Sequence, residues 1–168
     1  TNMHLHLERY IEGKGHLDLN DEGQVAGTMA QTIIDKGLCD MSEIWGSEVT
    51  LYYPGLYAGA TDLVGVYDYE DSIGDFKQSN KPKRKEWIED YFMKLGAYAM
   101  AHNCVYDTGI TQGVILMCTP DNYFQKFQIN DPALSNGSPP FAIADLAHEH
   151  SLSRSIDHYH YRRKCEGH

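Results

Sequence analysis

Long apolar runs and paired cysteines are both missing from this sequence. No stretch approaches the roughly 18 apolar residues that a membrane-spanning helix needs, and no signal-peptide pattern opens the chain. We therefore expect no membrane partner and an intracellular location. The four cysteines include no C-x-x-C pair, so a zinc or iron–sulfur centre has little support. We expect reduced thiols.

Positive charge is also in short supply. The chain has 14 lysines and arginines against 24 acidic residues, a net charge of −10. This balance argues against broad electrostatic capture of nucleic acid. The bases are nevertheless grouped. One group, called the basic cluster below, consists of Lys81, Lys83, Arg84 and Lys85, and a second consists of Arg162, Arg163 and Lys164. Such a run is usually a solvated loop, but beside an acidic metal pocket it suits a substrate with a phosphate backbone.

Length and periodicity predict one α/β domain. The chain has 168 residues, of which 42% are hydrophobic, enough for a folded core. Apolar spacing predicts helices over 1–12, 21–38 and 85–102, and strands over 43–53, 56–69, 71–78, 113–119 and 123–129. The order ααβββαββ indicates a mixed central β-sheet flanked by helices. We assign 1–130 to this domain and 131–168 to a poorly defined C-terminal tail with a hint of helix near 141–152.

Each predicted helix should bury one apolar stripe. The expected inner residues are Met3, Leu7, Tyr10 and Ile11 in the first helix, Val25, Met29, Ile33 and Ile34 in the second, and Trp87, Tyr91, Leu95 and Tyr98 in the third.

The most informative residues are three charged ones on two neighbouring strands. Asp62 lies in GATDLVG, and Asp75 and Lys77 lie in SIGDFK. Asp75 and Lys77 are two residues apart, so on a strand their side chains share a face. If Asp62 lies on the adjoining strand, all three converge. Two carboxylates can hold a divalent cation, and a lysine beside them can position or deprotonate a water. This pattern predicts a metal-dependent phosphodiesterase.

The G-x-x-D…D-x-K pattern followed by a long helix resembles the PD-(D/E)XK nuclease superfamily. More narrowly, the sequence is similar to RecB-like exonucleases of phages and to the mitochondrial genome maintenance exonuclease. Thr1–His4 also matches the T-x-x-H part of a G-T-x-x-H motif on an early helix of these relatives. The resemblance spans roughly residues 1–129. It implies a restriction-endonuclease-like core and a DNA partner that is single-stranded or has free ends. It also implies Mg²⁺ or Mn²⁺, and a bacterial or phage-infected cytoplasm in preference to a mitochondrion.

The resemblance also implies roles for individual residues. Asp62 and Asp75 become metal ligands, the Phe76 backbone carbonyl a third oxygen ligand, and His4 a further ligand or a phosphate contact. Lys77 becomes the residue that orients the attacking water or stabilises the pentavalent phosphate.

Other positions have supporting roles or depart from the family. Glu48, on the preceding strand, matches an often acidic position behind the metal ligands. The family helix usually carries Q-x-x-x-Y. Here Tyr98 supplies the tyrosine, but Lys94 stands where glutamine is expected and can either contact phosphate or reach solvent. The basic cluster is assigned to DNA contact.

These residues together predict a Mg²⁺- or Mn²⁺-dependent DNA exonuclease acting in replication, repair or recombination. Three alternatives stay open. One is an endonuclease of the same superfamily, such as a resolvase or a restriction-like enzyme. Another is a catalytically silent, nucleic-acid-binding recombination subunit. The third is an α/β domain in which Asp75 and Lys77 form only a surface ion pair. Exo or endo mode, strand polarity and oligomeric state, which ranges from monomers to rings among relatives, are not decided by the sequence.

Overall fold

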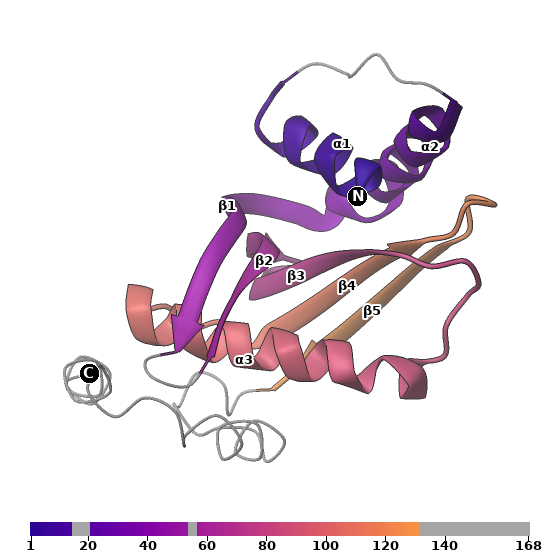
Figure 1. The fold of residues 1–168 in the computed structure, drawn as a ribbon. Coiled ribbons are helices and arrows are strands. Elements are labelled where there is room, and N and C mark those ends of the chain that lie inside the picture. Colours follow the sequence, from indigo (N-terminus) through magenta and orange to yellow (C-terminus); the bar gives the residue numbers. More distant parts are fainter. Residues whose placement is uncertain (15–20, 54–56, 132–168) are drawn as a thin grey trace.

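The computed structural model describes residues 1–14, 21–53 and 57–131. These residues form a five-stranded sheet with the spatial order β1-β2-β3-β4-β5. The strands are β1 (Met41–Tyr53), β2 (Tyr57–Tyr67), β3 (Glu70–Gln78), β4 (Gln112–Cys118) and β5 (Phe124–Asn130). Helices α1 (Asn2–Ile11) and α2 (Asp21–Lys36) lie over one side of the sheet, and α3 (Glu89–Tyr106) lies over the other (Figure 1).

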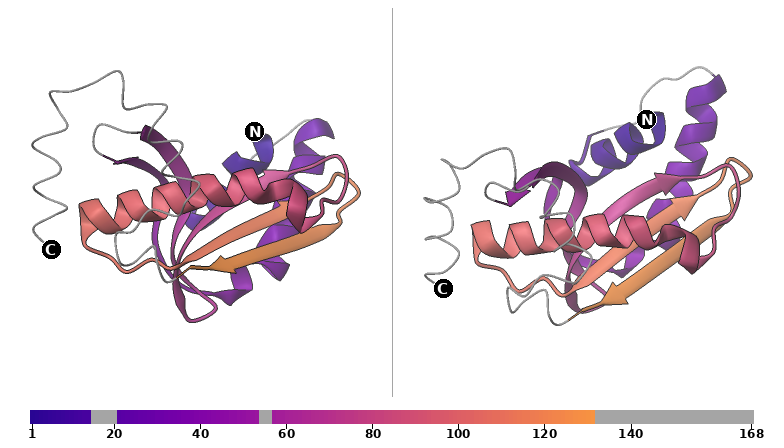
Figure 2. Two further views of the ribbon diagram at one scale, coloured as in Figure 1. Left: turned by 90° about the horizontal axis from the view of Figure 1, so that it is seen from below. Right: turned by 60° about the horizontal axis from the view of Figure 1, so that its bottom comes forward.

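The sheet is mixed because one connection crosses it. Strands β1, β2 and β3 form an antiparallel meander, and β5 pairs antiparallel with β4. Strand β3 runs parallel to β4, and parallel neighbours need a long crossover. Helix α3 is that crossover and lies along the face of the sheet (Figure 2).

Alternation along the strands divides the core into two layers. Successive side chains of a strand point to opposite faces, so Ile73, Ile115 and Met117 pack with α3, whereas Phe76 and Leu116 pack with α1 and α2. The predicted fold class and element order are confirmed, with two 3₁₀ turns added: η1 (Leu38–Asp40) and η2 (Lys85–Ile88).

Helix α1 begins at a side-chain cap. The Thr1 hydroxyl accepts a hydrogen bond from the His4 backbone N–H at 3.3 Å, which satisfies one of the free donors of the first turn. Met3 and Leu7 are fully buried, as predicted. Tyr10 and Val25 were expected to be buried, but both are exposed. The face of each helix that packs on the sheet is narrower than the set of its apolar residues.

The third helix starts later than predicted, and its inner stripe differs. Residues 85–88 form the turn η2, and α3 begins only at Glu89. The change from a 3₁₀ to an α repeat shifts the buried face, so Ile88 is buried and Trp87 is exposed. The expectation that Trp87 lies in the core was therefore wrong. Leu95 is buried as predicted, and Tyr91 and Tyr98 are half-buried.

The described cysteines differ in their state. Cys39 and Cys118 are free thiols, as expected, but Cys104 is disulfide-bonded, which corrects the expectation of reduced thiols at that position. Within the described part of the chain, no helix is both long and apolar enough to cross a membrane. The C-terminal tail, its hint of helix near 141–152 and the second basic group lie outside the described residues.

Candidate active site

The site lies where β2 and β3 separate. Their antiparallel ladder runs from Tyr67 opposite Glu70 to Leu63 opposite Gly74. Asp62 and Asp75 are the next residue on each strand, one position past the last pair. Strand β3 meanwhile stays paired with β4 through Asp75 and beyond. The carboxylate of Asp62 is therefore free to turn toward the β3 backbone, where the Phe76 N–H donates to its Oδ2 at 2.8 Å.

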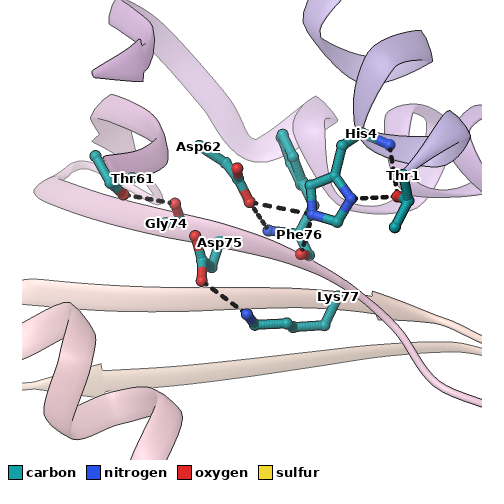
Figure 3. A network of polar contacts seen from close by, with 8 residues as sticks. All are labelled: Thr1, His4, Thr61, Asp62, Gly74, Asp75, Phe76 and Lys77. Atoms are coloured by element: carbon teal, nitrogen blue, oxygen red, sulfur yellow. Dashed lines mark hydrogen bonds and ion pairs between the residues drawn. The ribbon is translucent and has the colours of Figure 1, made fainter. Parts of the chain in front are cut away.

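Asp75 and Lys77 share the α3-facing side of β3, as their spacing predicts. The Lys77 ammonium lies 3.2 Å from Asp75 Oδ2, and the two side chains are 29% and 16% exposed. Lys77 Nζ also lies 4.8 Å from the centre of the Tyr91 ring on α3, a cation–π arrangement. The lysine is thus held between the Asp75 carboxylate, with which it is drawn in Figure 3, and the ring of Tyr91.

His4 reaches the same place from α1. Its Nε2 lies 2.7 Å from the Phe76 carbonyl oxygen and 3.4 Å from Asp62 Oδ2. Its Nδ1 lies 2.5 Å from the Thr1 hydroxyl, so the residue that caps the helix also orients the imidazole (Figure 3). The hydrogen bond that His4 donates to the Asp62 carboxylate raises the pKa of His4, against an opposing effect of burial.

The two aspartates have opposite electrostatic environments. Burial alone would raise the pKa of Asp62, but hydrogen bonds from His4 and the Phe76 N–H lower it to about 2. Burial, followed by the Asp62 charge, raises the pKa of Asp75 to about 6, and Lys77 only partly opposes this rise. One carboxylate is therefore a permanent anion, while the other lacks enough positive charge around it.

Glu48 lies across the β1–β2 pair from Asp62. The neighbouring positions pair as Ser47 with Leu63 and Val49 with Thr61, so the register places Glu48 opposite Asp62. Its backbone is in the left-handed region, with φ of 50°. Partial burial, and then the hydrogen bond and charge of Asp62, raise its pKa to about 7. Glu48 thus lies beside Asp62, and its predicted role behind metal ligands stays a prediction.

The chemistry of these groups fits a divalent cation. Two carboxylates and a backbone carbonyl are the hard oxygen donors that Mg²⁺ prefers. His4 Nε2 lies 2.7 and 3.4 Å from the two nearest oxygens. Those separations bracket the spacing of about 3 Å between adjacent ligands of an octahedral Mg²⁺. No three histidine, cysteine or acidic side chains of the described residues form a ready metal cage, so the carbonyl and waters would have to complete the ligand set.

The predicted basic residues form no hydrogen bond or ion pair with the candidate site within the described part of the chain, whereas Tyr98 lies beside it. Lys81, Arg84, Lys85 and Lys94 are exposed, and Lys83 is half-buried. Tyr98 lies next to the site: burial and then the Asp75 charge raise the pKa of its hydroxyl. Its ring lies against Gly59, where an added Cβ would be 2.1 Å from the Tyr98 oxygen. The glycine of G-x-x-D thus makes room for the helix tyrosine.

Sequence reasoning missed two supporting residues. The buried Thr61 hydroxyl donates to the Gly74 carbonyl at 3.0 Å, which links β2 to the last paired residue of β3 from just beyond the point where the strands part. Its place beside Asp62 in an apolar strand was the available signal, since a buried hydroxyl needs a partner. Tyr91 was expected to be a core aromatic, and only the approach of α3 to β3 shows that it contacts Lys77.

A mixed sheet with helices on both faces and a charged site at a strand separation defines an α/β protein with a candidate functional site. No protein-family model matches the chain, and no curated protein sequence matches it. Among solved structures, it is similar to a protein from Eubacterium rectale provisionally named an exonuclease, with 13% identity and a TM-score of 0.53. The match covers 98% of this chain but only 66% of that one. A second likeness, to SSO0001, has 12% identity and a TM-score of 0.37, covering 90% and 85% of the two chains. The first likeness shows a shared fold.

Proposed function

We propose that this chain is a Mg²⁺- or Mn²⁺-dependent deoxyribonuclease, an exonuclease that hydrolyses phosphodiester bonds in DNA that is single-stranded or has free ends. One observation carries the proposal: His4 from α1, Asp62 from β2, and Asp75 and Lys77 from β3 meet at the separation of β2 and β3. The likeness to a structure provisionally named an exonuclease adds support from the fold.

Asp62, Asp75, the Phe76 carbonyl and His4 are the groups that would hold the cation. When bound, such a cation lowers the pKa of a water and neutralises phosphate charge. The environment of Asp75 suits this role, because its raised pKa reflects a carboxylate short of positive charge. Asp62 is already an anion with its orientation fixed by the Phe76 N–H.

Lys77 would act on the phosphate side of the reaction. Its ammonium is held 3.2 Å from Asp75 and against Tyr91, so it is fixed in place before substrate arrives. A fixed cation can aim a water at phosphorus and stabilise the charge that develops on the phosphate oxygens. Glu48, with a pKa of about 7 beside Asp62, is placed to exchange a proton with solvent near neutral pH.

The direct test uses end-labelled single strands and duplexes in Mg²⁺ and in Mn²⁺. Asp75→Asn and Lys77→Ala should each lower the rate of degradation by about 100-fold or more, and EDTA should abolish it. A matched control exists in a second lysine–aspartate pair, Lys126 and Asp40, 3.0 Å apart. Lys126→Ala and Asp40→Asn should leave the rate unchanged. If the wild-type protein leaves these substrates intact in both Mg²⁺ and Mn²⁺, the proposed nuclease activity is refuted.

Two further measurements separate the remaining alternatives. A closed circular DNA should survive, since only an endonuclease nicks it. Calorimetry without nucleic acid should show Mn²⁺ binding that is lost in Asp62→Ala. A Mn²⁺ signal that Asp62→Ala does not change would mean that the metal binds elsewhere.

A further inference from the structure

An exposed tryptophan precedes α3. Trp87 is 63% exposed, although the next residue, Ile88, is fully buried. Single exposed apolar side chains are common and need no explanation. Trp87 differs because the Arg84 guanidinium lies 5.4 Å from its ring centre, and because the whole basic cluster lies within the six residues that precede it. An aromatic face therefore stands directly after a basic stretch, between Glu86 and Glu89, in a chain with a net charge of −10.

This segment is anchored to the sheet. The Lys83 N–H donates to the Gln125 side chain at 2.8 Å, and the Gln125 amide donates back to the Lys83 carbonyl at 2.8 Å. The Ser79 hydroxyl donates to the Lys81 carbonyl at 2.6 Å, and Ile88 is buried in the core beneath α3. A fixed aromatic ring loses little conformational entropy on binding, which favours recognition by stacking.

The anchored segment adjoins the candidate active site. It continues the strand that carries Asp75 and Lys77. Tyr91, four residues after Trp87, lies against Lys77. A strand of nucleic acid that places a phosphate at Lys77 would therefore have its neighbouring nucleotides close to this segment.

We infer that Trp87, together with Arg84, is a stacking platform for an unpaired base of a single-stranded nucleic acid, with Lys81, Lys83 and Lys85 contacting its phosphates. The inference rests on the proposed function and specifies its substrate as unpaired. An aromatic face can stack on a base only if that base is out of a duplex, and basic residues beside it follow the backbone. Charge complementarity favours this occupant over a protein partner, because a polyanion matches four clustered cations.

The test measures binding without catalysis. A fluorescein-labelled dT oligonucleotide is titrated in EDTA, and anisotropy gives the dissociation constant. Trp87→Ala should weaken binding roughly 5- to 100-fold, and Trp87→Phe should retain most of it. The matched control is Trp45→Ala. Trp45 is the second tryptophan, 38% exposed on β1 and stacked on His102, and its loss should leave the affinity unchanged.

Fluorescence gives a second readout that does not depend on the folding of Trp87→Ala. In Trp45→Phe the emission comes from Trp87 alone, and dT should quench it while an abasic oligonucleotide of equal charge should not. Equal quenching by dT and by the abasic oligonucleotide would refute base stacking on Trp87. Binding of a blunt duplex as tightly as dT would refute it as well. So would unchanged affinity in Trp87→Ala. These measurements need no cleavage, so a protein that binds dT through Trp87 but cuts nothing would refute the proposed function alone.

Discussion

Asp62 and Asp75 face each other one position past the end of a β-ladder, yet they differ in what surrounds them. Asp62 has donors from α1 and from the β3 backbone, whereas Asp75 has burial and a neighbouring negative charge. Bringing two acids together without a cation costs free energy, because one of them is held in an environment that favours its neutral form. The site is therefore expected to be electrostatically strained until a cation is added.

This strain predicts how stability depends on pH in EDTA. The pKa of Asp75 in the folded protein is about 6, above its ordinary value of 3.8, so stability falls as the pH rises from about 4 to about 6. Asp75→Asn should reduce this fall by up to about 3 kcal/mol, and Glu48, whose pKa is raised to about 7, should account for a fall that remains. Asp62 has the opposite effect on stability. Because its pKa is lowered to about 2, the stability that it contributes to the folded protein is lost as the pH falls from about 4 to about 2. Urea unfolding across this pH range measures both, and a fall that persists unchanged in Asp75→Asn would contradict the first.

His4 offers a second test at a single position. Its imidazole contacts Asp62 and the Phe76 carbonyl together, so His4→Ala should lower nuclease activity and Mn²⁺ affinity about 10- to 100-fold. His6, on the same helix, contacts α2 at Gly27 instead, and His6→Ala is the matched control. Equal losses in both variants would mean that α1 acts only through its packing.

The sequence was sufficient to predict Asp75 and Lys77 on one face, because a strand has a fixed period of two. It was also sufficient to bring Asp62 to them, because a short turn between two apolar segments predicts a hairpin. Tyr91 against Lys77 was not predictable, since it depends on the height at which α3 crosses β3. The exposure of Trp87 was mispredicted because a four-residue 3₁₀ turn has a different period from the α-helix that follows it.

Helix α3 and strand β2 meet at a contact that only glycine permits. A Cβ at Gly59 would lie 2.1 Å from the Tyr98 hydroxyl oxygen and 2.6 Å from its ring. Tyr98 in turn lies near Asp75 and Lys77. The packing of a helix on a strand therefore sets the position of an aromatic side chain at the candidate site.

Gly59→Ala should displace Tyr98, lowering the free energy of unfolding by about 1–3 kcal/mol and reducing activity. In a Tyr98→Ala background the same substitution should cost much less, because the clashing ring is gone. Gly109→Ala is the control, since nothing lies within 4 Å of an added Cβ there. Denaturant unfolding of the wild type, the two single variants and the double variant measures the coupling between Gly59 and Tyr98. If the two effects on stability are additive, the cost of Gly59→Ala does not come from a clash with Tyr98.

Over the whole molecule, charge is unevenly distributed. The net charge is −10, yet the exposed cations of the basic cluster follow directly on the strand of the site. Among the described residues, the basic cluster is where a polyanion would be attracted. Binding should therefore be weak and strongly dependent on ionic strength.

If Lys81, Lys83 and Lys85 each neutralise one phosphate, the logarithm of the affinity for dT should fall with the logarithm of salt concentration with a slope of about −2. Replacing Lys81 and Lys85 by alanine should reduce the magnitude of that slope by about 1.4. Replacing Lys14 and Lys36 instead, at the ends of the helical layer on the opposite face, removes the same charge and should leave the slope unchanged. Titrations between 50 and 200 mM salt, about the range in which counterion release is easily measured, decide between the two.

Phe76 connects the helical layer of α1 and α2 to the candidate active site. Its ring is buried with α1 and α2, while its N–H and carbonyl contact Asp62 and His4. Anything that loosens the helical layer, including modest heating or a smaller residue at Met3 or Leu7, would shift that backbone. If the proposed function is right, thermal inactivation should then precede global melting, so that activity is lost while most of the sheet is still intact.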